Sequence, residues 1–200
     1  MVRLVANTGS TDVMTAYLGA CSERKNITPA ELKLFQVVLD KGSLEEQIRA
    51  VEALAFVPQR PVRRTLIGIL SNSAAPLDVR ERATEMLHLH ESRETAEACA
   101  KALGDPSASI RFWAAYTLGQ IAGFRKGIPE IAAPALASVL DDREVAPGWW
   151  SVGREAQASI VGLRGDPGER ERLQAEIRRV QQDPTASAED RRWAECYSDS

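Results

Sequence analysis

The sequence predicts an all-α fold, in which pairs of helices stack in a row to form a right-handed α-α superhelix, an α-solenoid. A helical phrase occurs at residues 110–119, IRFWAAYTLG, and in weaker form at residues 79–87, VRERATEML. Apolar residues recur with helical spacing, and no segment alternates as a strand does. Recurrence over a few tens of residues is typical of two-helix units that bury apolar surface only against their neighbours.

Four copies of the unit align on a small residue in the middle of each first helix. This residue is Ala50, Ala83, Ala114 or Ala156, at successive spacings of 33, 31 and 42 residues. Alanine lets two helices approach closely, which explains a small residue here. The longer third spacing indicates an inserted loop, which we assign to residues 141–148 because they contain a helix-breaking Pro-Gly pair.

Capping patterns place the helix boundaries. Residues 28–31, 43–46 and 166–169 each have an N-cap oxygen three residues before a glutamate, the pattern of a capping box. The glycines expected to end a helix in a left-handed conformation are Gly42, Gly104 and Gly165. Together with the apolar rows, these signals predict helices at 11–24, 29–41, 44–56, 61–72, 77–89, 93–104, 106–122, 128–141, 149–163, 167–182 and 187–196.

The predicted domain organisation is simple. Residues 11–196 are expected to form a single solenoid of four to five helix pairs, closed by a short capping helix that carries Trp193. Residues 1–10 and the tail 197–200 have no core to join and are expected to be mobile.

One unit resembles a known repeat. Its signature residues are Asp105, Ile110, Arg111, Ala114, Leu118 and Gly119. They resemble a HEAT repeat, specifically the short type found in phycobilisome lyases; armadillo-like stacks of related geometry stay possible. The helix pattern of the resemblance covers roughly residues 43–182.

The resemblance implies structural roles for charged residues. In such repeats the Arg of one unit reaches an Asp of its own or an adjacent unit, so Asp105 and Arg111 are expected to form a rung of this ladder. Arg80 keeps the Arg position in the preceding unit. Elsewhere the ladder is incomplete: Gln47 and Lys41, Ala74, and Gly153 and Pro147 replace its members in the other units.

Composition narrows the class of protein. The 200 residues carry a formal net charge of −3, which argues against a protein that coats nucleic acid. The first residues turn polar too soon for a secretory signal and no stretch is apolar enough to span a membrane, so we expect a cytoplasmic protein. The three cysteines lie far apart and predict neither disulfides nor a zinc site; Cys21 and Cys99 are expected to be buried and Cys196 exposed.

No catalytic or metal site is predicted. His88 and His90 are the only histidines, and positions two apart on a helix face different sides, so we interpret them as last-turn residues near a helix C-terminus. The adjacent carboxylates 45–46 and 141–142 are interpreted as solvated charges. Nucleophile elbows and phosphate loops need a strand before a helix, and none is predicted. We therefore expect no catalytic residue, no metal and no cofactor.

Two clusters are candidate contact sites. Arg63 and Arg64 open a second helix, the kind that lines the concave face of such stacks. In the functional interpretation, Arg64 forms a basic stripe with Arg93 and Lys101 on the next second helix, weakened by Glu94 and Glu97. The default interpretation is that these charges are solvated and paired with one another.

The second cluster is the pair Trp149 and Trp150, which follow the insertion. Adjacent residues do not both face one core, so one of them is either an exposed binding anchor or part of a loop packed over the stack end.

The leading functional hypothesis is a non-catalytic interaction module that holds a segment of a partner protein in a concave groove, with Arg63, Arg64, Glu97, Lys101, Trp149 and Trp150 as contacts. One alternative is a lyase-like or accessory subunit that handles a bilin or another modified substrate, as the resemblance implies. A third is nucleic-acid binding, which the net charge disfavours. The fold alone does not choose among them.

Overall fold

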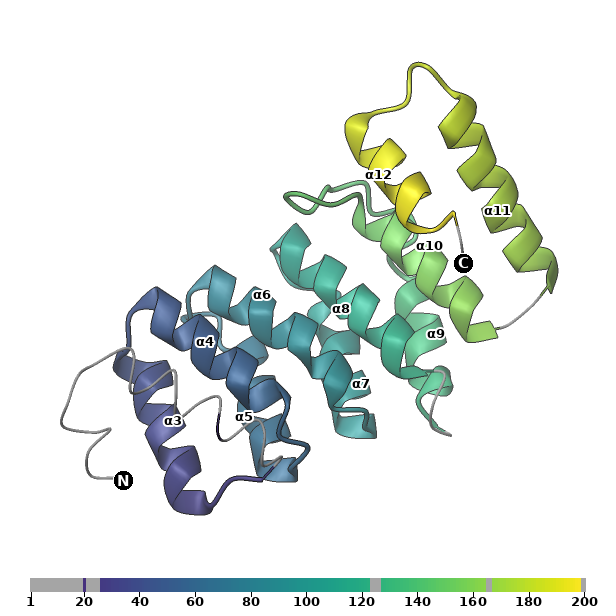
Figure 1. Ribbon diagram of the computed structural model, residues 1–200. Coiled ribbons are helices and arrows are strands. Elements are labelled where there is room, and N and C mark those ends of the chain that lie inside the picture. Colours follow the sequence, from purple (N-terminus) through teal and green to yellow (C-terminus); the bar gives the residue numbers. More distant parts are fainter. Residues whose placement is uncertain (1–19, 21–25, 123–126, 165–166, 199–200) are drawn as a thin grey trace. The chain divides into compact units, whose positions relative to one another are not determined.

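A computed structural model describes residues 20, 26–122, 127–164 and 167–198 (Figure 1). The predicted helix 11–24, apart from residue 20, and the N-terminal segment 1–10 lie outside this part, as does Cys21. The described helices are α3 (Pro29–Lys41), α4 (Leu44–Ala55), α5 (Arg60–Ser71), α6 (Leu77–Met86), the 3₁₀ turn η1 (Leu87–Leu89), α7 (Arg93–Ala102), α8 (Ala108–Ala122), α9 (Pro129–Ala137), α10 (Val152–Arg164), α11 (Pro167–Gln182) and α12 (Ala188–Cys196). The regular structure of the described residues is helical, apart from one isolated bridge between Val145 and Ser151. The predicted all-α solenoid class is therefore confirmed.

Two of the predicted capping boxes are present. The Thr28 side chain accepts from the Glu31 N–H while the Glu31 carboxylate accepts from the Thr28 N–H, and Ser43 and Glu46 repeat the arrangement at α4. Each box satisfies two donors that the start of a helix leaves unpaired. These sequence patterns therefore fix the starts of α3 and α4.

The predicted role of two glycines was wrong. Gly42 follows α3 with a φ of −70°, and neither it nor Gly104 has the left-handed backbone that the sequence analysis assigned to them. Gly42 is needed for a different reason: a Cβ at this position would lie 2.6 Å from the Val38 carbonyl oxygen. Close approach of the chain, rather than handedness, explains this glycine. Gly165 lies outside the described residues.

The chain divides into two compact units, the first ending at His90. In the first unit, α4 packs against α3, α5 and α6, and α5 also packs against α6. Phe35, Leu54 and Leu66 are fully buried in its core. Ala50 and Ala83 are completely buried as well, at the α4–α6 contact where the repeat pattern expects close approach.

The second unit starts at Glu91 and is built around α8 and α10, which pack along each other. Ala114 and Ala156 are completely buried there. A Cβ at Gly119 of α8 would overlap the Oγ of Ser159 on α10 and approach its Cβ to 2.7 Å. The two first helices of this unit thus touch through small residues, as the spacing of the repeats predicts.

The insertion forms a tight hairpin between α9 and α10. The Val152 N–H donates to the Glu144 carbonyl (3.1 Å), and the Ala146 N–H donates to the Trp150 carbonyl (3.2 Å). Gly148 turns the chain with a φ of +83°, a conformation that glycine adopts without strain. As a result α9 ends at Ala137 and α10 begins at Val152, four residues earlier and three residues later than predicted.

The C-terminal helix α12 closes the second unit. Trp193 is completely buried, and the Arg154 guanidinium lies 4.3 Å from the centre of its ring. Arg154 also pairs with Asp190 at 2.6 Å. Tyr197 packs against the buried cluster that includes Trp150 and Trp193. The expectation that residues 197–200 have no core to join was therefore wrong for Tyr197.

Candidate functional site

An open groove runs along α3 and α5 in the first unit. It consists of two adjoining pockets of about 490 and 370 Å³. We call it the α3–α5 groove and define it by these lining residues: Leu32, Gln36, Leu39 and Asp40 of α3, Gln47 of α4, Arg60, Pro61, Arg64, Thr65, Gly68 and Ile69 of α5, and Asn72, Ala74, Ala75, Pro76 and Val79 after α5. Gln36 and Thr65 line both pockets, so the two form one continuous depression.

The two helices run in the same direction along this groove. Residues from the first halves of α3 and α5, such as Leu32 and Arg60, line one pocket, and residues from their second halves, such as Asp40 and Ile69, line the other. In the pocket that contains Asp40, Gly68 has no atom within 4 Å of the position of a Cβ, so the absence of a side chain there keeps the depression open.

The predicted contact residues fall in both units. Arg64 is exposed and lines the groove, whereas Arg63 is half-buried and does not line it. Glu97 and Lys101 lie on α7 of the second unit with Arg93, four residues apart on one exposed face. Arg93 and Glu97 form an ion pair of 2.8 Å, with their side chains 73% and 54% exposed.

The structure separates the two adjacent tryptophans. Trp150 is only 4% exposed, and its indole N–H donates to the Glu155 carboxylate at 2.9 Å. Trp149 is 38% exposed and stacks on Phe112, with ring centres 5.6 Å apart, while its edge meets Trp113. Trp150 is therefore a core residue and not a rim contact, and only Trp149 is accessible to a partner.

Glu155 is a buried acid that sequence reasoning missed. It is 1% exposed, and besides Trp150 it accepts from the Tyr197 hydroxyl, which lies 3.0 Å from both carboxylate oxygens. Burial raises its pKa to about 7, and the hydrogen bonds from Tyr197, Trp150 and Ser159 only partly offset this. The signal in the sequence was its position three residues after Val152 and four before Ser159, on the buried face of α10.

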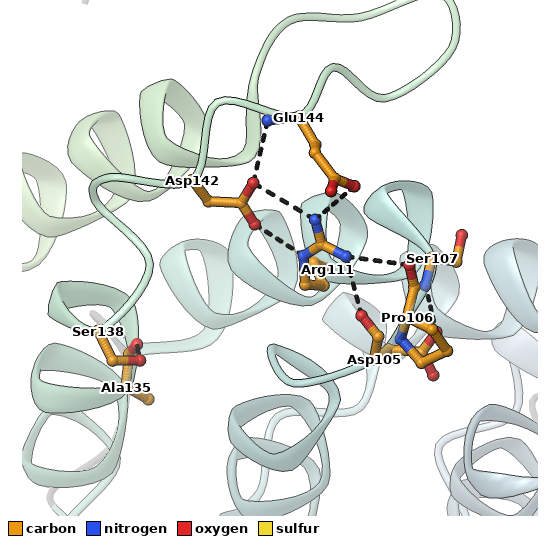
Figure 2. Close-up of polar contacts among 8 residues, drawn as sticks. All are labelled: Asp105, Pro106, Ser107, Arg111, Ala135, Ser138, Asp142 and Glu144. Atoms are coloured by element: carbon orange, nitrogen blue, oxygen red, sulfur yellow. Dashed lines mark hydrogen bonds and ion pairs between the residues drawn. The ribbon is translucent and has the colours of Figure 1, made fainter.

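Arg111 links α8 to the hairpin (Figure 2). Its Nε lies 2.7 Å from Asp142 and its Nη2 lies 2.9 Å from Glu144, while Nη1 donates to the Asp105 carbonyl at 2.9 Å. The Asp105 carboxylate accepts from the Ser107 N–H (2.9 Å) and shapes the turn before α8. The hydrogen bond to Asp142 raises the pKa of Arg111 above its usual value.

Asp142 was assigned wrongly from the sequence. It was interpreted as a solvated charge, yet its side chain is only 16% exposed because it pairs with Arg111. The repeat alignment placed Pro147 at the ladder position of this unit. The inserted hairpin follows Asp142 in the chain. Asp142 therefore lies five residues before Pro147, the position that the alignment compared with Asp105.

Two further arginines hold neighbouring helices. Arg80 is buried, and its Nε and Nη2 donate to the Leu70 carbonyl at 3.2 and 3.1 Å, which satisfies a carbonyl at the end of α5. Arg154 joins α10 to α11 and α12 through Glu176 and Asp190. The sequence analysis did not identify Arg154, because the repeat alignment placed the preceding residue, Gly153, at the position of Arg111.

The two histidines lie in different surroundings. His88 is half-buried, and its Nδ1 contacts the Glu85 carbonyl at 2.6 Å. His90 is buried, and desolvation lowers its pKa to about 4. Within the described residues, no cluster of three or more His, Cys, Asp or Glu side chains is arranged to hold a metal ion.

Comparison with known proteins identifies the repeats. A family model described as HEAT repeats matches residues 64–147, which run from α5 through α9 into the hairpin. A search of the curated proteins found no match. Among the described helices, none has the length and apolar character needed to cross a membrane.

Proposed function

Since residues 64–147 make this chain a HEAT-repeat protein, we propose that it is a non-catalytic interaction module that holds a segment of a partner protein in the α3–α5 groove. HEAT repeats are commonly scaffolds for protein interactions, and the family is generally non-enzymatic. The observation that carries the proposal is the open, continuous depression between the parallel helices α3 and α5. Repeat proteins use such extended surfaces to bind partner segments.

The groove has the composition of a contact surface. Leu32, Leu39 and Ile69 supply apolar area, and amide and hydroxyl side chains lie between them. Arg64 supplies an exposed charge. Of the other predicted contacts, we retain Arg63, Glu97, Lys101 and Trp149 as secondary candidates.

The test is to fill the groove without disturbing the fold. Gly68→Met places a long side chain where nothing lies within 4 Å of the Cβ position, and replacing a mid-helix glycine favours the helix. The matched control is Gly162→Met on α10, which also has free space and lies in the second unit. Peptides would be selected from a displayed library of random dodecapeptides on the full-length protein, and their affinities measured for all three proteins.

We expect Gly68→Met to weaken the selected peptides at least tenfold and Gly162→Met to leave them unchanged. Equal binding by wild type and Gly68→Met, with both proteins folded by circular dichroism, would remove the groove as the binding surface. Failure of the wild type to select any peptide would count against the proposed function as well.

A further inference from the structure

The α3–α5 groove has a built-in electrical polarity. Because α3 and α5 are parallel, their N-terminal ends, with partial positive charge, lie at one end of the groove and their C-terminal ends at the other. Side-chain charges have the same order: Arg60 and Arg64 line the N-terminal end, and Asp40 lines the C-terminal end. The helix dipoles and the charged side chains that line the groove therefore have the same direction. Glu31 in the first turn of α3 and Lys41 in its last turn have the opposite order, but they do not line the groove.

Amide side chains lie along the same depression. Gln36 lines both pockets, and Gln47 and Asn72 line the pocket that contains Asp40. The Gln47 amide nitrogen donates to the Gly42 carbonyl at 3.0 Å, and its oxygen is buried, so this oxygen is not exposed to a bound peptide. Asn72 accepts from the Ala74 N–H at 3.1 Å and keeps its amide nitrogen for donation. Amides donate and accept at once, as the main chain of an extended peptide requires.

The dimensions set the length of the occupant. The twelve steps from Arg60 to Asn72 rise about 1.5 Å each along the helix axis, so this side of the groove spans about 18 Å. An extended chain advances about 3.3 Å per residue, so the groove holds about five or six residues. Gly68 lies in the pocket that contains Asp40, where the lack of a side chain allows a main chain to pass.

We propose that the α3–α5 groove binds an extended peptide of one orientation, with an acidic side chain at the Arg60–Arg64 end and a basic side chain about four to six residues away at the Asp40 end. This inference rests on the proposed function, because it names the class of segment that the groove takes. Nucleic acid fits the site less well, since a phosphate backbone repeats its negative charge along its length and would meet Asp40.

The charges are tested on the peptide, which leaves the protein intact. The consensus of the selected dodecapeptides is synthesised with a fluorescent label, together with a version in which its acidic and basic residues exchange places. Binding to the wild-type protein is measured by fluorescence anisotropy at low and high salt. Exchange turns two attractions into two repulsions between partly exposed charges, so we expect about five- to tenfold weaker binding, and less difference at high salt.

A protein variant supplies the converse experiment. Arg60→Glu and Arg64→Glu combined with Asp40→Lys reverse the polarity of the groove, and this variant should bind the exchanged peptide better than the original. Thermal unfolding checks that this variant is folded.

The outcomes separate the two proposals. If the consensus peptide binds in a Gly68-dependent way but the exchanged peptide binds equally well, the polarity is wrong and the proposed function stands. If binding is independent of Gly68, or no peptide is selected, both are wrong. Preferential capture of a single-stranded oligonucleotide over the consensus peptide would also overturn the peptide assignment.

Discussion

The Tyr197 hydroxyl lies 3.0 Å from both carboxylate oxygens of Glu155, so the last turn of the described chain is tied to a buried acid of α10. All the side-chain donors that surround this acid are neutral: Tyr197, Trp150 and Ser159. Because none of these three donors is a cation, they do not compensate for the burial of a charged Glu155, and the protonated form is favoured. Burial and the neighbouring Glu155 in turn raise the pKa of Tyr197, which keeps its hydroxyl a donor.

The second unit is therefore expected to lose stability as the pH rises. Glu155 titrates near 4.5 when unfolded and at about 7 when folded, so between these values the folded state binds more protons. Its contribution is fully present below pH 4.5 and is lost as the pH rises through 7, on the order of 3 kcal/mol in total. Hydrogen exchange of α10 and α12 as a function of pH measures this loss.

Glu155→Gln removes the titrating group and keeps the shape. The amide does not ionise, so we expect the fall in stability above pH 4.5 to disappear and the variant to exceed wild type at pH 8 by about 1–3 kcal/mol. The control is Glu195→Gln, an exposed carboxylate on α12. If both variants kept the pH dependence of wild type, Glu155 would not be its source.

The first unit is expected to respond in the opposite direction. Burial lowers the pKa of His90 from 6.5 to about 4, so below 6.5 the unfolded chain binds more protons than the folded one. This contribution is fully present above pH 6.5 and disappears as the pH falls through 4. The protection factors of amides in α4 and α5, which are exchange rates corrected for the intrinsic effect of pH, should fall over that window. His90→Gln, which keeps an N–H donor without the charge, should suppress this fall.

Arg111→Ala is expected to destabilise the second unit by about 1–3 kcal/mol, because it leaves the Asp142 carboxylate largely buried without its cation. Arg93→Ala breaks the exposed Arg93–Glu97 pair and should change stability by less than about 0.5 kcal/mol. Urea unfolding monitored by tryptophan fluorescence provides both values. Similar effects for the two variants would contradict a structural role for the Arg111 network.

Gly119→Ala should destabilise the contact between α8 and α10 by about 1–3 kcal/mol, since the added methyl overlaps Ser159. Gly162→Ala meets no neighbour and should stabilise α10 by about 0.5–1 kcal/mol through helix propensity. Combining Gly119→Ala with Ser159→Gly should recover most of the lost packing. Melting temperatures of the four proteins test the series, and a stable Gly119→Ala protein would mean that the helices do not approach so closely.

Most helices of the described chain could be predicted from local patterns. The capping boxes at Thr28 and Ser43 and the buried alanines of the repeat are local or periodic signals, and they act over a few residues. Predictions failed where distant contacts decided the outcome. Neither the pairing of Asp142 with Arg111, 31 residues apart, nor that of Tyr197 with Glu155, 42 residues apart, leaves a trace in the local sequence.

The sequence by itself determined the all-α class, the helix-pair repeat and the position of the insertion, because apolar periodicity and turn residues act locally. Only the tertiary structure decided that Trp150 is buried while Trp149 is exposed, and that α3 and α5 leave an open groove with charges of opposite sign at its ends. The physical reason is that burial and electrostatic environment depend on which elements pack together, and packing joins residues that are far apart along the chain.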